Sequence, residues 1–290
     1  MKYYMAILET IILFSTVEVA SKLIAGKVDP LFLAFLRYFI SGSIIMALGL
    51  KEELKRGVEW KECLKLILIG VAGITISIGL FHTSLQYINA AEGAVIFSIN
   101  PIFSAFFAWI LLKEKFSKES IAGMAIAMAG VYILSFGFKK IDIRDSYGII
   151  QMVISALMFG FYIAVSKKQM KKHNRFFATG AIFLSGAIFY IPFIKNYKIE
   201  AVPFTLPVIL YLAIAATGVA YILYFYGLSK VNVAAGSSMF YLKPIFASVL
   251  AVLILHERPG INFYIGFVII VAGMFLSTIY PFFKKSANLK

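Results

Sequence analysis

The chain has few of the residues on which soluble enzymes and disulfide-linked proteins depend. Only one of its 290 residues is a cysteine, Cys63, and this excludes a disulfide framework and a cysteine metal cluster. Charged residues make up 14% of the chain, whereas an ordinary soluble domain has roughly 25%. The motifs HExxH, CxxC, GxSxG, Walker A and GxGxxG are all missing. We therefore expect neither an enzyme nor a nucleotide-driven pump, and neither a metal nor another cofactor.

Long apolar segments dominate instead. The chain is 61% hydrophobic with a mean hydropathy of +0.89. A helix of about 20 apolar residues crosses a hydrocarbon core about 30 Å thick. Runs of that kind lie at 3–24, 31–50, 62–85, 91–112, 118–138, 146–166, 175–194, 206–228, 234–255 and 261–282. We therefore predict an all-α integral membrane protein with ten transmembrane helices.

The basic residues are unevenly distributed between the predicted loops. With ten helices, one side of the membrane receives 17 Lys and Arg residues and the other receives 8. The positive-inside rule then places both termini in the cytoplasm, and we expect a prokaryotic cytoplasmic membrane. The net charge of +14 follows from the excess of basic residues on the cytoplasmic side, and it also attracts the chain to anionic membrane lipid. It does not require a nucleic-acid partner.

The chain also contains an internal repeat. The segment "NAAEGAVIFSINPIFSAFFAWILLKEK" (89–115) aligns with "NVAAGSSMFYLKPIFASVLAVLILHER" (232–258) without a gap. A weaker match, at a slightly larger offset, aligns "LFSTVEVASK" (13–22) with "MFGFYIAVSK" (158–167). We therefore expect a first repeat at 1–138, a second at 146–282 and a cytoplasmic tail at 283–290, with five helices in each repeat.

A five-helix repeat begins and ends on opposite sides of the membrane, so the second copy is expected to be inverted. The loop "KEKFSKES" carries three lysines and its partner "HERPG" carries one arginine, which agrees with opposite placement. Inverted repeats are the architecture of many secondary transporters, with the substrate near the membrane midplane and alternating access by rocking.

The motif segments resemble a known family. "PIFSAFFAWILLKEKFSKESIAGMAIAMAGVYIL" and "PIFASVLAVLILHERPGINFYIGFVIIVAGMFL" are similar to the two signature halves of EamA-type members of the drug/metabolite transporter superfamily. The resemblance covers essentially the whole chain. It implies ten helices and transport of small metabolites, often the export of amino acids.

Lys243 is the first candidate for a substrate-binding residue. A lysine at the centre of a membrane helix costs about 2.5 to 3.5 kcal/mol on insertion scales. Its repeat partner, Asn100, is also a candidate substrate-binding residue. The residues that follow them, Pro244 and Pro101, free backbone carbonyls nearby. Lys243 either binds substrate or a coupling ion, or pairs with a buried carboxylate such as Glu18, or is hydrated without a role.

Aromatic side chains are expected around the same site. They either stack on an aromatic cargo or hold an ammonium group by cation–π contact; packing is the alternative for each. The candidates are Phe97, Phe240, Tyr241, Tyr162, Tyr221 and Tyr224.

A second set of polar residues is expected near the outer ends of helices. Glu18 can carry a coupled proton, but a structural ion pair with Lys22, four residues on, or with Arg37 is the favoured interpretation. His82 is expected at the interface, with a proton relay as the alternative. Three carboxylates at helix ends are expected to cap or anchor them: Glu92, Glu114 and Glu257.

Together these features predict a proton-coupled or facilitative transporter of a small polar metabolite, such as an amino acid or related organic ion, acting as an exporter. Its partners would be a small-molecule solute and a proton or counter-solute gradient. The alternative is an importer or exchanger of phosphorylated or nucleotide-linked sugars. We expect a monomer or weak homodimer.

Overall fold

The computed structural model describes residues 2–57, 59–113, 118–136, 143–200, 203–231 and 233–276. The first half contains α1 (Lys2–Ser15), α2 (Val17–Leu23), α3 (Pro30–Arg56), α4 (Trp60–Gly70), η1 (Val71–Ile78), α5 (Gly79–Ser84), α6 (Ala90–Phe97), α7 (Asn100–Leu112) and α8 (Lys118–Phe136). The second half contains α9 (Ile143–Gln169), α10 (Arg175–Ile188), η2 (Ile191–Phe193), α11 (Thr205–Ala213), η3 (Ile214–Val219), α12 (Ala220–Leu228), α13 (Val233–Ser238), η4 (Met239–Leu242), α14 (Lys243–Leu255) and α15 (Ile261–Met274).

Each of the ten apolar ranges expected from the sequence overlaps one helix or a run of adjoining helices. Among the described residues, seven runs are long and apolar enough to cross a membrane: Lys2–Leu23, Pro30–Arg56, Trp60–Ser84, Ala90–Leu112, Ser146–Gln169, Arg175–Phe193 and Thr205–Leu228. The other three ranges coincide with α8, with α13 to α14, and with α15. The expected tail at 283–290 lies outside the described residues.

Backbone irregularities recur in the two halves at the offset of the internal repeat, which places Pro101 on Pro244. The first residues of the π-helical stretches η1 and η3 are related by this offset. So are those of α7 and α14, each of which has a proline in its first turn. Lys113 and His256 are related in the same way and have left-handed φ angles of 57° and 54°. The repeat in the sequence is therefore also a repeat in the backbone.

The start of each half repeats at the slightly larger offset, which places Leu13 on Met158. Asp29 and Asn174 are related by this offset, and they cap α3 and α10 by accepting amide hydrogen bonds. Two residues are called counterparts when the repeat aligns them. From the start of each half through its second apolar range, the offset is the one that aligns Leu13 with Met158. For the rest of each half, counterparts are related by the offset of the two prolines.

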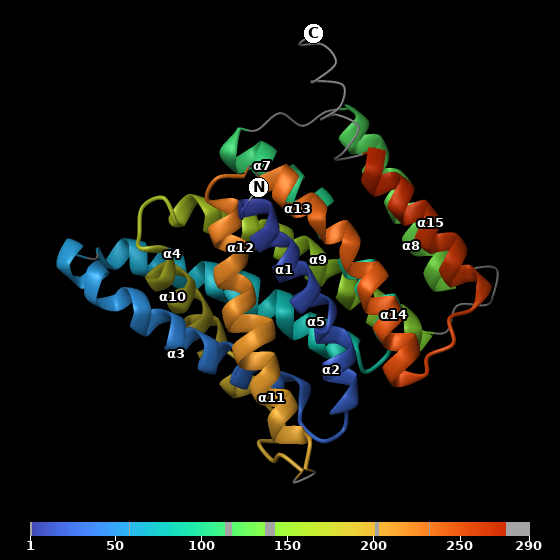
Figure 1. The fold of residues 1–290 in the computed structure, drawn as a ribbon, viewed down its shortest axis with the longest axis horizontal. Coiled ribbons are helices and arrows are strands. Elements are labelled where there is room, and N and C mark those ends of the chain that lie inside the picture. Colours follow the sequence, from blue (N-terminus) through green and yellow to red (C-terminus); the bar gives the residue numbers. More distant parts are fainter. Residues whose placement is uncertain are drawn as a thin grey trace.

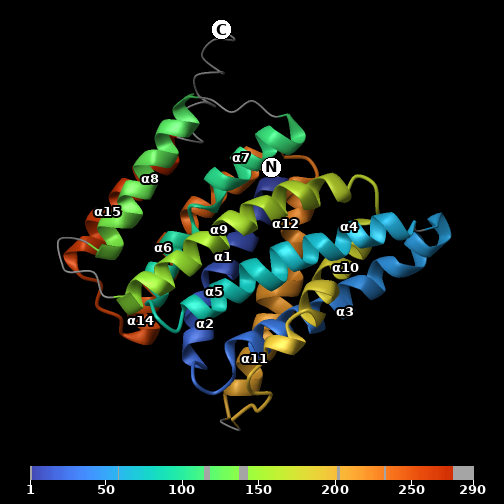
Figure 2. The ribbon, with the colours of Figure 1, turned by 180° about the vertical axis from the view of Figure 1, so that it is seen from behind.

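The helices pack in matching pairs. Figure 1 shows α8 and α15 side by side at one end of the molecule and α3 with α10 at the other. α1 lies in the middle, packed against α12 and α14. α9 packs against α5, η1 and α7, and Figure 2 shows it crossing the molecule on the opposite face. The centre of the molecule therefore lies between α1 and α9, which begin the two halves.

Glycines allow the α8–α15 pair to approach closely. A Cβ atom built on Gly273 would lie 2.5 Å from the amide nitrogen of Ala127, and one on Gly130 would lie 2.7 Å from that of Ile270. Small residues at helix interfaces are a common device in membranes, where close backbone packing drives association. The pair thus depends on the absence of side chains at these two positions.

Candidate functional site

A buried ion pair joins the two halves at the centre of the molecule. Lys243, the first residue of α14, donates from Nζ to Oε1 of Glu18 in α2. Their side chains are 3% and 0% exposed. Taking two charges out of water is costly, and close pairing offsets much of that cost. Lys243 therefore pairs with Glu18 in this conformation, and its role in binding substrate or a coupling ion stays a prediction.

The ion pair of Glu18 with Lys22 or Arg37, favoured from the sequence, is wrong. Lys22 lies four residues from Glu18, but its side chain lines a hollow at the end of α2. Arg37 is held by groups on other helices. Spacing along one helix brings side chains onto the same face, but Glu18 is fully buried and its acid group meets α14 across the interface instead.

The proline after Asn100 explains the position of that side chain. Pro101 has no N–H group, so it cannot donate to the carbonyl of Phe97, four residues earlier. Asn100 Nδ2 donates to this carbonyl at 2.8 Å. Its Oδ1 is buried and makes no hydrogen bond within the described part of the chain. The Asn100 side chain therefore supplies the hydrogen bond to Phe97 that Pro101 cannot make, and its Oδ1 remains available as an acceptor.

Aromatic rings surround the ion pair. Lys243 Nζ lies 4.7 Å from the ring centroid of Phe97 and 5.6 Å from that of Phe81, within cation–π range. Phe159 is central to the cluster, with its ring centroid 5.0 Å from that of Phe97 and 6.0 Å from that of Phe240. Five of the six predicted aromatic residues are buried in this region: Phe97, Tyr162, Tyr221, Tyr224 and Phe240. The sixth, Tyr241, lies in η4, and its side chain is outside the described set.

A small cavity lies next to the pair. Its volume is about 30 Å³, and its lining includes Phe14, Arg37, Tyr38, Phe81, Tyr221 and Lys243. A single water molecule occupies about 30 Å³ in the liquid, so the cavity has room for about one water. The structure thus brings two cations and several aromatic rings to one central point.

Arg37 and His82 form a buried polar contact beside this cavity. Arg37 donates to Thr217 Oγ1 from Nε at 3.1 Å and from Nη2 at 2.9 Å. Its Nη1 lies 2.7 Å from Nε2 of His82. A guanidinium cannot accept a hydrogen bond, so Nε2 of His82 is the acceptor. His82 is 3% exposed within the protein, and its expected position near the membrane interface stays a prediction.

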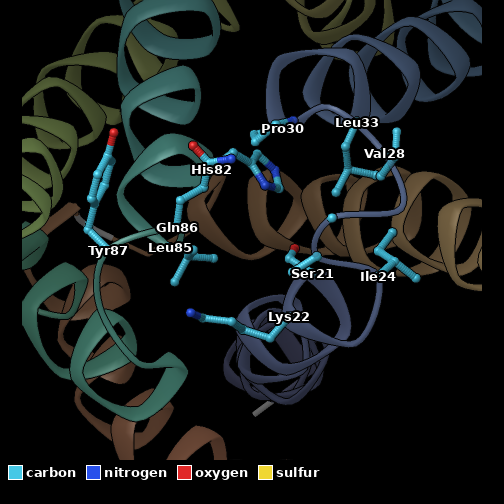
Figure 3. A pocket seen from close by; sticks show the side chains of 12 residues that line it. Ser21, Lys22, Ile24, Val28, Pro30, Leu33, His82, Leu85, Gln86 and Tyr87 are labelled. Atoms are coloured by element: carbon cyan, nitrogen blue, oxygen red, sulfur yellow. The ribbon is translucent and has the colours of Figure 1, made fainter. Parts of the chain in front are cut away.

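Two larger hollows open at opposite ends of α3. The α2–α3 hollow, about 420 Å³ in volume, is shown in Figure 3 and is lined by residues that include Ser21, Lys22, Pro30, His82 and Gln86. The α9–α10 hollow, about 360 Å³ in volume, is lined by residues that include Arg56, Lys167, Lys171, Arg175, Phe225 and Ser229. Pro30 and Arg56 are the ends of α3, a helix of 27 residues, so the hollows lie roughly 40 Å apart.

The two hollows occupy counterpart positions. The counterparts of Lys22, Pro30, His82 and Gln86 are Lys167, Arg175, Phe225 and Ser229, and every one of these eight residues lines its own hollow. The repeat seen in the sequence therefore extends to the surface concavities. Each half of the chain contributes one hollow built from equivalent segments.

The residues that lie between a hollow and the central cavity are polar on one side and aromatic on the other. From the α2–α3 hollow, His82 contacts Arg37, which lines the cavity. From the α9–α10 hollow, the ring of Phe225 lies 6.1 Å, centroid to centroid, from Tyr221, which also lines the cavity. Tyr162 lies 6.2 Å from Phe225 in the same barrier. One barrier is therefore polar and hydrogen-bonded, and the other is aromatic.

Reasoning from the sequence did not identify Thr217, Tyr38 or Phe81 as site residues. A comparison of the halves would have identified Thr217, because its counterpart is Ile74. The same contrast marks the rest of the polar set. The pairs in which one half is polar or charged and its counterpart is apolar or neutral are Glu18 and Ile163, Arg37 and Ile182, His82 and Phe225, and Lys243 and Asn100.

The helix-end carboxylates serve the fold. Glu257 accepts hydrogen bonds from the amides of Ala90 at 2.8 Å and Ala91 at 3.1 Å, at the start of α6. Glu92 accepts from the amide of Asn89 at 3.3 Å. These contacts agree with the expected anchoring and capping. Glu114 lies outside the described residues.

Known proteins share both the sequence and the fold. The chain is 28% identical to an uncharacterized transporter of Clostridium kluyveri, over 100% of this chain and 96% of the relative. It is 22% identical to a probable terminal-alkyne amino-acid exporter of Streptantibioticus cattleyicolor, over 72% of this chain and 71% of that protein. A crystal structure matches with a TM-score of 0.68 and 19% identity, covering 96% of each chain. The model of the EamA-like transporter family matches residues 1–136 and again 146–279.

Proposed function

The chain belongs to the EamA-like transporter family, and from this premise we propose that it exports a small polar metabolite, such as an amino acid or related organic ion, by alternating access. The observation that carries the proposal is the buried Glu18–Lys243 pair beside a cavity lined by aromatic rings. Buried ionisable pairs inside membrane proteins commonly mark solute or proton pathways. The amino-acid class is also supported by one distant relative, the probable amino-acid exporter of Streptantibioticus cattleyicolor.

The ion pair is suited to a zwitterionic solute. A carboxylate on the solute competes with Glu18 for Lys243, and an ammonium group competes with Lys243 for Glu18. The solute then replaces one ion pair with two, so neither buried charge is left uncompensated. The aromatic rings around Lys243 provide an apolar wall for the rest of the molecule.

Proton coupling follows from competition at the same carboxylate. A proton on Glu18 removes the partner of the solute's ammonium group, so proton and solute bind exclusively of each other, which is the requirement for antiport. The positive-inside rule assigns the α2–α3 hollow to the outer side. The polar contact of His82 and Arg37 then lies between the outside and the pair, which favours proton entry from that side.

The architecture that fits this function is ten transmembrane helices in two inverted five-helix repeats, 1–138 and 146–282, with both termini in the cytoplasm. Support comes from the counterpart irregularities and the counterpart hollows. Ligand sites usually measure about 300 to 1,000 Å³, far more than the central cavity of about 30 Å³. Loading therefore needs the halves to move and to open one hollow to the centre.

Transport of phosphorylated or nucleotide-linked sugars is a second candidate, because Arg37 lines the central cavity together with Lys243. Two cations can bind a phosphate dianion, and a guanidinium matches phosphate geometry well. Glu18 opposes this interpretation, since its carboxylate would repel the phosphate.

The first experiment is a thermal-shift screen of the purified protein against amino acids, amines, nucleosides and sugar phosphates, repeated with Lys243→Ala. A solute that stabilises the wild type should stabilise the variant much less and should be moved in proteoliposomes. A solute bound and transported equally well by Lys243→Ala would remove Lys243 from the site. A hit among sugar phosphates alone would favour the second candidate.

The coupling proposal has its own test in proteoliposomes with an imposed pH gradient. Glu18→Gln mimics the protonated carboxyl, so it should bind and exchange the solute much less than the wild type and should not accumulate it in response to the gradient. Glu9→Gln is the matched control, because Glu9 lies on α1 with an exposed side chain. If Glu18→Gln kept the wild-type response to pH, another group would carry the proton.

A further inference from the structure

The α9–α10 hollow is rimmed by cations. Arg56, Lys167, Lys171 and Arg175 all line it, and no Asp or Glu is among the described residues of its lining. Met170, Phe225 and Leu228 add an apolar surface. The hollow therefore combines a basic rim with an apolar floor. Phe225 in this floor contacts Tyr221, which lines the central cavity.

The counterpart hollow has a different charge. The counterparts of Lys167, Lys171 and Arg175 are Lys22, Gly26 and Pro30, so only the first of these three positions is basic there. Existing contacts occupy part of the basic rim: Arg56 pairs with Glu52 at 2.5 Å, and Lys167 Nζ donates to the carbonyl of Val231 at 2.9 Å. The positive-inside rule accounts for an excess of basic residues at the cytoplasmic end, but it does not require four of them to line one hollow over an apolar floor.

We propose that the α9–α10 hollow is the cytoplasmic loading site of the transport pathway and that it selects solutes carrying an anionic group, a carboxylate or a phosphate, attached to an apolar portion. This inference rests on the proposed transport function. The cations raise the local concentration of anions within about 10 Å at 0.1 M salt. The floor holds the apolar portion next to Phe225, the barrier that must move for entry. The outer hollow lacks this charge, so a released anion is not recaptured there as readily.

Because Cys63 is the only cysteine of the chain, replacing it leaves no thiol except the one introduced for labelling. In a Cys63→Ala background, Ser229→Cys places a thiol in the α9–α10 hollow and Gln86→Cys places one at the counterpart position of the α2–α3 hollow; both native side chains are exposed. Each variant is labelled with a membrane-impermeant maleimide in intact cells and in inside-out vesicles. Phenylacetate and phenylacetamide, which have similar shape and differ in charge, are the protecting probes.

We expect Ser229→Cys to react in inside-out vesicles only and Gln86→Cys in intact cells only. Phenylacetate should slow labelling of Ser229→Cys, by roughly half when its concentration equals its Kd, and phenylacetamide should protect much less. Adding Arg56→Gln, Lys171→Gln and Arg175→Gln should abolish the protection. The control variant carries Lys51→Gln, Lys55→Gln and Lys61→Gln, which remove the same charge from exposed residues that do not line the hollow. Phenylacetate should still protect Ser229→Cys in this variant.

Three outcomes would overturn the proposal. Labelling of both thiols from one side would show that the hollows are not opposite entrances. Equal protection by phenylacetamide would remove the selection for anions. Protection lost equally in the control variant would show a general surface-charge effect rather than a site.

A membrane phospholipid could supply the same anionic chemistry. Repeating the labelling in vesicles of pure phosphatidylcholine, with and without phosphatidylglycerol, separates the sources. Protection by phosphatidylglycerol with none by phenylacetate or inorganic phosphate would reassign the hollow to a lipid headgroup and overturn its loading role. A chain that transports solute without any protection at Ser229→Cys would overturn the loading site alone, whereas absence of all flux would count against the proposed function.

Discussion

At the residue scale, the Glu18–Lys243 pair should behave as one energetic unit. Removing one partner of a buried ion pair leaves the other charge without compensation and costs about 3 to 5 kcal/mol. We therefore expect Glu18→Gln and Lys243→Met each to lower the thermal unfolding temperature in detergent. The double variant should recover most of that loss, because no unpaired charge remains.

The matched control for this cycle is Lys22→Met with Glu18→Gln. Lys22 lies four residues from Glu18 but lines the α2–α3 hollow instead of pairing with it. Its effect should therefore add to that of Glu18→Gln without interaction. A Glu18→Gln, Lys243→Met chain destabilised by the full sum of its two single variants would argue against direct coupling of the pair.

The residue scale also shows what the sequence could and could not predict. The repeat identified Lys243 as the place where the halves differ. It offered Glu18 as one candidate partner but could not select it, because Glu18 lies 225 residues away in the chain and the i to i+4 rule describes only one helix. Hydropathy placed His82 near a helix end, but it carries no information on which way the side chain faces. Packing against Arg37 decides that.

At the element scale, the α8–α15 pair should respond to a single methyl group. A Cβ atom at Gly273 would lie 2.5 Å from the amide nitrogen of Ala127 and 2.6 Å from the carbonyl oxygen of Gly123. Backbone cannot yield as a flexible side chain does, so the helices must separate. We expect Gly273→Ala to destabilise the protein by about 1 to 3 kcal/mol, measured by thermal unfolding in detergent.

Gly260→Ala is the control for that substitution, because a Cβ atom there meets nothing within 4 Å. It should leave the unfolding temperature close to that of the wild type. Equal loss of stability from the two substitutions would show that close contact between α8 and α15 is not the cause, because Gly260 lies at the N-cap of α15 and not in that interface.

Helix positions were predictable from the sequence, whereas the irregularities inside them were only partly so. Pro101 and Pro244 indicated disturbed backbone in both halves, since proline lacks the N–H of the helix ladder, and α7 and α14 begin immediately before them. The π-helical stretches η1 and η3 contain no proline. Their wider turns depend on packing against α9 and α3, which local sequence does not specify.

At the scale of the whole molecule, the number of membrane crossings decides the topology. Seven runs of the described residues satisfy length and hydropathy, and an odd number would place the two termini on opposite sides. Ten crossings, with α8, the run α13 to α14, and α15 included, would place both termini on the same side. With ten crossings the basic residues divide 17 against 8 between the two sides, and the positive-inside rule then places both ends in the cytoplasm.

Reporter fusions at both termini distinguish these topologies. With ten crossings, a fluorescent protein that matures only in the cytoplasm should be bright at the N-terminus and at the C-terminus, and alkaline phosphatase, which is active only outside, should be inactive at both. Seven crossings would make one end bright and the other phosphatase-active. This second result would also remove the inverted repeat, because two five-helix units of opposite orientation require an even total. The two hollows would still face opposite sides, because they lie at the two ends of α3, which crosses in both topologies. They would no longer be related by an inverted repeat, so the alternating-access mechanism argued from Glu18, Lys243 and the two barriers depends on the count of ten.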